Sequence, residues 1–317
     1  MSQQMTVRVA DKYPIAQDTV AIELVPQDGE TLPAFTAGAH IDVFLGPQTV
    51  RQYSLANDPA ESNRYLLGVL KAPQSRGVSK ALHDQLKPGM LLKIGTPRNV
   101  FPLEENASMS LLIGGGIGIT PMLTMAWRLQ QLGRPFELHL CSRSREAAPF
   151  VDQIQASPLA ASFYLHLDTD GPEQRLDPAA LAAQALAGSH LYVCGPAGFM
   201  DWVMQEAGHH LPEEQRHQEH FDTAPETLLN PVFAAWVSSQ NLRLEVPAHQ
   251  TLLDSLAEQQ IFLPRNCPRG MCGSCKVRVL KGEVDHRDQL LLPEQRAEGW
   301  MLPCISRALS EELVLDL

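Results

Sequence analysis

Four cysteines near the C-terminus constrain this chain more than any other feature. They are spaced C-x4-C-x2-C, and 28 further residues separate the third from the fourth: Cys267, Cys272, Cys275 and Cys304. This is the plant-type ligand pattern of a [2Fe–2S] cluster, on which four thiolates converge. Gly270 and Gly273 suit a loop that wraps a cluster closely, because glycine accepts positive φ and adds no side chain. The spacing therefore predicts an iron–sulfur cluster.

Zinc sites and disulfides are the other common uses of clustered cysteines. Structural zinc sites usually carry two C-x2-C pairs, whereas this chain has one, and a C-x4-C spacing before it is unusual for zinc. Disulfides are disfavoured because three cysteines crowd into nine residues and no secretory signal is visible. Zinc stays open as an alternative, while iron–sulfur is favoured.

Length and composition indicate an ordinary globular protein. The 317 residues are enough for two or three domains, and the chain is 44% hydrophobic and 19% charged. The formal net charge of −11 argues against nucleic-acid binding. No apolar run approaches the ~20 residues of a membrane span, and the N-terminus does not resemble a signal peptide. We expect a cytoplasmic monomer that binds neither membrane nor nucleic acid.

Residues 1–102 are predicted to form a small antiparallel β-barrel. Short apolar or alternating runs separated by proline and glycine are typical of such barrels. The expected strands cover residues 6–10, 19–25, 40–45, 51–55, 65–70 and 90–94, and one helix is expected from Ser79 to Leu86.

Two segments of the barrel carry groups that suit a cofactor. Along a strand, Arg51 and Tyr53 face one side and Ser54 the other. A cation, an aromatic ring and a hydroxyl can hold a phosphate and a planar ring, although this motif alone is often a plain strand. The second segment, residues 75–79, places Arg76 and a glycine before the expected helix, which is typical of an anion site, with Ser79 as a candidate cap. Together they predict a pocket for a ring and a phosphate.

Residues 103–223 alternate between expected strands and helices, which indicates a doubly wound parallel α/β sheet. A glycine turn at 114–118 follows the first strand, with Thr120 as the expected N-cap and Pro121 as the first helical residue. Ile119 stands where the G-x-G-x-x-G fingerprint requires its third glycine, so a dinucleotide site and a simple tight turn both stay open. Ligands of such sheets bind at the carboxyl ends of strands, where the 194–196 turn also falls.

Residues 224–232 contain two prolines and no clear periodicity, and we interpret them as a linker. Residues 233–317 combine a strand pair, a helix near 252–259 and further strands around the cysteine loop. This pattern favours a ferredoxin-like β-grasp domain. Within it, residues 285–288, Asp-His-Arg-Asp, are interpreted as a solvated charged turn.

The three parts, in this order, resemble the reductase components of class IA Rieske-type aromatic oxygenase systems over essentially the whole chain. The resemblance rests on an ordered set of motifs: Arg51-Gln-Tyr53-Ser54-Leu55, Ser75-Arg-Gly-Val-Ser79, Pro97-Arg98-Asn99, residues 114–121, Cys194-Gly-Pro196, the four cysteines, residues 285–288 and residues 313–317. Asn266 and Pro268 depart from the family, which more often has serine before the first ligand and an acidic residue after it. This departure bears on the cluster potential and on the choice of partner.

The resemblance implies FMN, NADH and a [2Fe–2S] cluster as cofactors. It implies that the FMN phosphate is held by Arg51, Arg76, Gly77, Val78 and Ser79, with Tyr53 against the isoalloxazine and Ser54 near its N5. It implies an NADH pyrophosphate site made by Gly115, Gly116, Gly118 and Thr120. By the same resemblance, the nicotinamide lies beside Cys194, Gly195 and Pro196, and Phe221 shields the flavin.

The implied function is electron transfer from NADH through FMN and the cluster to a separate Rieske-type oxygenase or demethylase that acts on an aromatic acid. A flavin suits this task because hydride carries two electrons and a [2Fe–2S] centre accepts one. The alternatives are a reductase for a quaternary-amine (carnitine-like) Rieske monooxygenase, a ferredoxin-type carrier without enzymatic activity, and a zinc-stabilised interaction protein. NADPH also stays open, because Ser142, Arg143 and Arg145 could meet a 2′-phosphate.

Overall fold

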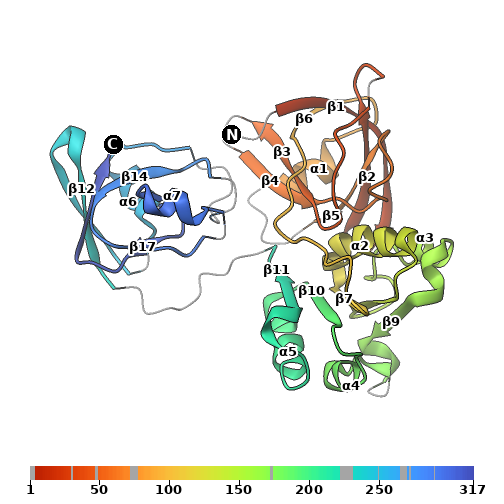
Figure 1. The fold of residues 1–317 in the computed structure, drawn as a ribbon. Coiled ribbons are helices and arrows are strands. Elements are labelled where there is room, and N and C mark those ends of the chain that lie inside the picture. The colour runs from red at the N-terminus through yellow and green to blue at the C-terminus, as the bar shows by residue number, and fades with distance from the viewer. Residues whose placement is uncertain are drawn as a thin grey trace. The chain divides into compact units, whose positions relative to one another are not determined.

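The computed structural model describes residues 4–29, 31–46, 49–71, 78–171, 174–221, 231–248, 250–264, 270, 273–288 and 290–317. The chain separates into two compact units; among the described residues, the larger unit lies within 4–45 and 52–221 and the smaller within 46–51 and 231–317 (Figure 1). Within the described ranges, no helix is long and apolar enough to cross a membrane.

The first sheet of the larger unit is a closed antiparallel barrel. Its strand order is β4-β3-β6-β1-β2-β5, and an antiparallel bridge from Leu55 to Leu67 closes it by joining the end of β4 to β5. Alternate apolar residues such as Val7 and Val9 fill the interior. The elements are β1 (Gln4–Ala16), β2 (Thr19–Pro26), β3 (His40–Gly46), β4 (Thr49–Ser54), β5 (Tyr65–Leu70), α1 (Val78–Asp84) and β6 (Leu91–Gly95). The predicted antiparallel barrel is confirmed.

The second sheet of this unit is parallel, in the order β11-β10-β7-β8-β9. Its two faces are covered separately, because Leu112 and Leu138 pack in a cluster with α2 and α3, whereas Leu111 and Leu191 pack with α4 and α5. The elements are β7 (Ser110–Gly115), α2 (Ile119–Leu132), β8 (Phe136–Ser142), α3 (Val151–Gln155), β9 (Phe163–Leu167), α4 (Pro178–Ala183), β10 (His190–Cys194), α5 (Ala197–Ala207) and β11 (Arg216–Glu219). The doubly wound prediction is confirmed, and the strand order reverses between β7 and β10.

The start of α2 differs from its predicted form. A 3-10 turn, η1 (Gly116–Gly118), leads into the helix, which begins at Ile119. Thr120 lies in the first turn of α2 and its Oγ1 donates to the Ile117 carbonyl at 3.0 Å, so the prediction of Thr120 as N-cap was wrong. Glycine at positions 116 and 118 permits the tighter turn before the helix. Further 3-10 turns are η2 (Pro158–Ser162), η3 (Asp168–Asp170), η5 (Glu213–Gln215) and η6 (Ser238–Gln240).

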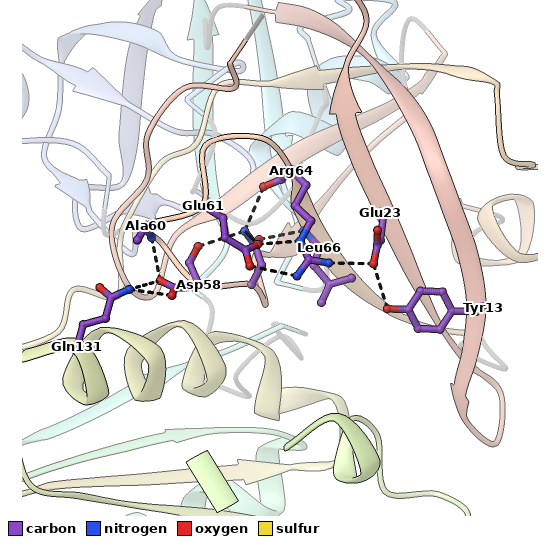
Figure 2. A network of polar contacts seen from close by, with 9 residues as sticks. Tyr13, Glu23, Asp58, Ala60, Glu61, Arg64, Leu66 and Gln131 are labelled. Atoms are coloured by element: carbon purple, nitrogen blue, oxygen red, sulfur yellow. Dashed lines mark hydrogen bonds and ion pairs between the residues drawn. The ribbon is translucent and has the colours of Figure 1, made fainter. Parts of the chain in front are cut away.

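Polar contacts join the barrel to the nucleotide sheet (Figure 2). Arg64 donates to Glu23 of β2 at 2.9 Å and to Glu61 at 2.8 Å. In the same loop, Asp58 accepts two bonds of 2.7 Å from Gln131 of α2. These contacts run from β2 through the barrel loop to α2, and they help to fix the position of the barrel against that helix.

The smaller unit contains a mixed five-stranded sheet in the order β13-β12-β18-β14-β16. Strands β12 and β18 are parallel, and the other pairs are antiparallel. Helix α6 packs on this sheet through Leu252 and Leu256, as a β-grasp fold requires. The elements are β12 (Phe233–Val237), β13 (Leu242–Val246), α6 (Leu252–Glu258), β14 (Val277–Lys281), β15 (Val284–Asp285), α7 (Pro293–Ala297), β16 (Trp300–Met301), β17 (Arg307–Ala308) and β18 (Glu312–Asp316).

Candidate cofactor and electron-transfer site

Strand β4 carries the predicted flavin motif. Tyr53 packs against the barrel core and is partly buried, whereas Ser54 is buried. One residue before Tyr53, the Nε2 of Gln52 is buried without a hydrogen-bond partner in the part of the chain that the structure describes. A buried donor without an acceptor is costly. This strand therefore fits a bound group that offers ring carbonyls or ring nitrogens, as a flavin does.

The predicted phosphate turn is described only at its end. Val78 and Ser79 are the first two residues of α1 and both are buried. Ser79 is therefore the second residue of the helix and not its cap. Arg76 and Gly77 lie outside the described residues.

The two glycine-containing turns of the nucleotide sheet meet at its carboxyl edge. Strands β7 and β10 pair in register, with Gly114 opposite Cys194. A Cβ added to Gly118 would lie 2.1 Å from the Cys194 carbonyl oxygen, and one added to Gly195 would lie 3.0 Å from the Gly115 Cα. Glycine is therefore needed for the turns to approach each other.

Gly116 has a different requirement, because its φ is +54° and a Cβ there would meet nothing within 4 Å. Ligands of open α/β sheets bind where the strand order reverses, which here is between β7 and β10. Open space above a glycine backbone at this point fits a pyrophosphate. Pro196 precedes α5 as its N-cap residue, and the Thr120 hydroxyl is already bonded within its own turn.

Ser54, Cys194 and Glu219 bring the barrel and the nucleotide sheet together at one place. Ser54 Oγ donates to Glu219 Oε2 at 3.4 Å, and Glu219 pairs with Cys194 across β11 and β10. Burial raises the pKa of Glu219 to about 8, and the bond from Ser54 lowers it only in part. Burial, with the nearby Glu219 carboxyl, also raises the pKa of the Cys194 thiol. The thiol is therefore neutral, and it is not an activated nucleophile.

Sequence reasoning missed Glu219 as a site residue. The sequence signal that could have found it was its position, because Glu219 ends a parallel strand at the edge of the sheet where ligands bind. Phe221, which was predicted, follows β11 and packs, partly buried, against the cluster that includes Cys194.

Replacing Glu219 with glutamine is expected to change how stability depends on pH. The folded protein keeps this carboxyl protonated up to about pH 8, whereas the unfolded chain ionises it near the ordinary value of 4.5. The folded state holds the extra proton, so the free energy of unfolding falls as pH rises from 4.5 through 8, by at most about 1.4 kcal/mol per pH unit. E219Q should lack this decline.

Melting temperatures of the larger unit between about pH 5 and 9 test this expectation. Glu213 is exposed, so E213Q should keep the wild-type pH dependence. Parallel curves for wild type and E219Q would show that the buried carboxyl does not titrate as expected.

The two predicted cluster ligands that the structure describes lie in an apolar environment. Cys275 and Cys304 are both buried, in one cluster with Leu253, Leu291 and Leu302. The Gly270 N–H donates to Cys304 Sγ at 3.2 Å. Gly270 and Gly273 have φ of +70° and +67°, as predicted for a closely wrapped loop. These thiols, in a loop with a backbone donor to sulfur, fit an iron–sulfur cluster; Cys267 and Cys272 lie outside the described residues.

Comparison with known proteins shows the family. The chain is 45% identical to the vanillate O-demethylase oxidoreductase of Pseudomonas sp. (strain HR199 / DSM 7063), over 96% of each chain. It is 36% identical to the phthalate dioxygenase reductase of Burkholderia cepacia, over 99% of this chain and 97% of that one. The chain belongs to the phthalate dioxygenase reductase family. A solved phthalate dioxygenase reductase, described as a modular structure for electron transfer from pyridine nucleotides to [2Fe–2S], matches with a TM-score of 0.73 at 35% identity, over 99% of this chain and 98% of that one.

Family membership confirms the main predictions from the motifs. The 2Fe-2S iron-sulfur cluster binding domain matches residues 237–309, which contain all four predicted ligands. The chain is an oxidoreductase of the kind that serves oxygenase or demethylase systems. The predicted cofactors FMN, NADH and a [2Fe–2S] cluster agree with this family and fold. The interpretations as a zinc protein or as a ferredoxin-type carrier are correspondingly disfavoured.

Proposed function

We propose that this chain is the NADH-dependent reductase of a two-component system, and that its partner is a Rieske-type oxygenase or demethylase acting on an aromatic acid. The proposed organisation is an FMN-binding barrel at 1–102, an NAD-binding domain at 103–223, a linker at 224–232 and a ferredoxin domain at 233–317. This division is supported by the sheets of the described residues, because the barrel sheet lies within 1–102, the parallel sheet within 103–223, and the mixed sheet and the two-stranded β15-β17 sheet within 233–317.

The observation that carries this proposal is the meeting of Ser54, Cys194 and Glu219. It joins the barrel strand that fits a flavin to the strand end that fits a nicotinamide. A bound flavin supplies the exchange between two-electron hydride chemistry and single-electron transfer. Ser54 offers a hydroxyl near the flavin, and Cys194 with its neutral thiol lines the nicotinamide side. Glu219, whose pKa is about 8, holds a proton within hydrogen-bond reach of Ser54 at neutral pH.

The other predicted residues have binding roles in this proposal. Arg51 and the residues 76–79 hold the flavin phosphate, and Tyr53 covers the ring. Gly115, Gly116, Gly118 and Thr120 shape the turn for the dinucleotide pyrophosphate, and Gly195 and Pro196 shape the facing turn. Phe221 packs over the flavin and excludes water. Cys267, Cys272, Cys275 and Cys304 bind the cluster.

Anaerobic titration with NADH tests the proposed function directly. The full-length holoprotein should lose both its flavin absorbance and its visible iron–sulfur absorbance as NADH is added, because both groups accept electrons from it. The matched comparison is steady-state kinetics with NADH and with NADPH. We expect a much lower kcat/KM for NADPH. A preparation with bound flavin and cluster whose iron–sulfur band did not bleach would contradict the proposal.

The preference for NADH is supported by the contacts near the second strand of the nucleotide sheet. Arg145 donates to Asp152 at 2.6 Å in an exposed ion pair, so Asp152 competes with a 2′-phosphate for this guanidinium. The aromatic substrate of the partner is proposed from the similarity to the vanillate O-demethylase oxidoreductase. A cytoplasmic monomer without affinity for nucleic acid stays a prediction.

A further inference from the structure

The segment 285–288 is not the solvated turn that its composition suggests. Asp285 is partly exposed and pairs with Arg287 at 2.6 Å. The Asp288 side chain is 0% exposed. A fully buried carboxylate is rare unless it is paired and hydrogen-bonded. The interpretation of this segment as a solvated turn was therefore wrong for Asp288.

Asp288 ties together three segments of the smaller unit. Its Oδ2 accepts the Leu291 N–H at 2.8 Å, and its Oδ1 accepts the Ser306 hydroxyl at 3.3 Å. Arg296 Nη2 lies 3.6 Å from Oδ2 and donates to the Asp288 carbonyl oxygen at 2.7 Å. His286 Nδ1 lies 3.6 Å from Oδ1. The carboxylate thus has a guanidinium counter-charge and two neutral donors.

The same residue lies against the predicted cluster site. A Cβ added to Gly270 would lie 3.0 Å from the Asp288 Cβ and 3.3 Å from its Cα. Gly270 in turn donates its N–H to Cys304 Sγ, and Ser306, which bonds to Asp288, is two residues beyond Cys304. Asp288 therefore contacts both chain segments that meet at the Cys304 sulfur.

We propose that Asp288 and Arg296 form a positioning ion pair for the [2Fe–2S] cluster. Asp288 fixes the separation of Gly270 from the Cys304 segment, and the ion pair of the buried Asp288 with the partly exposed Arg296 sets the local electrostatic field. Cluster potentials depend on net charge and on hydrogen bonds to sulfur, so this pair tunes the reduction potential. The inference rests on the proposed function only in requiring that the cluster is bound.

Two substitutions test the proposal, one of which removes a negative charge and the other a positive charge. Asp288→Asn keeps the shape and removes a negative charge, so an added electron is stabilised and the midpoint potential of the cluster should rise. Arg296→Gln removes a positive charge, so the potential should fall, by a smaller amount because Arg296 is 35% exposed. A purely structural role would not produce shifts of opposite sign.

The measurements are the midpoint potential, from a redox titration followed by EPR, and the iron and labile sulfide content of each full-length holoprotein. Asp285→Asn is the matched control, because it removes a partly exposed, paired carboxylate from the same segment and should leave the potential unchanged. Arg296→Lys keeps the charge and should restore most of the wild-type value.

Shifts of the same sign, or an equal shift in the Asp285 control, would overturn the proposal. If Asp288→Asn fails to hold a cluster, the Arg296 variants still test the proposal. An unchanged midpoint potential in Arg296→Gln would show that the ion pair does not set the reduction potential of the cluster. Wild-type protein without iron and sulfide would instead contradict the proposed function.

Discussion

Cys304→Ser is expected to abolish the cluster and with it all electron transfer that passes through the cluster. Cys304 is buried, and its Sγ accepts a hydrogen bond from the Gly270 N–H. In the variant, a serine hydroxyl would replace the sulfur at the place where the predicted ligand loop meets the Cys304 segment. Iron and labile sulfide should fall to background, and NADH-driven reduction of a partner or of cytochrome c should fall with them. Reduction of ferricyanide, which can take electrons from the flavin, should persist.

The matched control for this variant is Cys141→Ser. Cys141 is partly buried, and burial raises the pKa of its thiol to about 12, but it lies on β8 in the nucleotide sheet. This control should keep full iron and sulfide. A Cys304→Ser protein that retained wild-type iron content and wild-type reduction of cytochrome c would show that the fourth ligand is a different residue.

Gly118→Ala is expected to have the second largest effect, on NADH use and on stability together. Its Cβ would lie 2.1 Å from the Cys194 carbonyl oxygen and 2.4 Å from the carbonyl carbon. Both atoms are backbone, so the two turns must separate, at a cost of about 1–3 kcal/mol for overpacking of this kind. If that distortion falls on the bound nucleotide, kcat/KM for NADH should drop roughly tenfold or more.

Gly198→Ala is the control, since Gly198 lies in the first turn of α5 and a Cβ there meets nothing within 4 Å. It should keep the wild-type melting temperature or raise it slightly, because alanine is the better helix former. Steady-state kinetics with NADH and thermal unfolding followed by flavin release measure both variants. Equal behaviour of the two would mean that the contact between the turns is not needed.

Much of the fold could be predicted because its signals are local. The cysteine spacing, the proline- and glycine-separated strands and the strand–turn–helix pattern around residues 109–132 each reflect short-range geometry. The barrel, the parallel sheet and the mixed C-terminal sheet all appear as expected. The predicted start of α2 was wrong. Thr120 and Pro121 are a typical pair for the N-cap and the first helical residue, but the glycines before them allow a 3-10 turn that leads into the helix at Ile119.

The residues that sequence reasoning missed are those whose role depends on distant partners. The pKa of Glu219 is raised by burial and lowered in part by the hydrogen bond from Ser54, which is 165 positions away in the chain. Asp288 becomes buried because Leu291, Arg296 and Ser306 supply donors and charge. A single sequence shows the charge of such residues but not the surroundings that make them functional.

The Ser54–Glu219 contact has a consequence for how such reductases can be recombined. The barrel and the nucleotide sheet share an apolar cluster, in which Ala21 and Leu66 pack with Leu112 and Met122, and Gln131 is bonded to the barrel loop. A chimaera spliced near residue 102 would pair a hydroxyl from one parent with a carboxyl from another. These two modules should therefore be exchanged only as one block, which makes the segment near 223 the better crossover point for grafting a foreign ferredoxin.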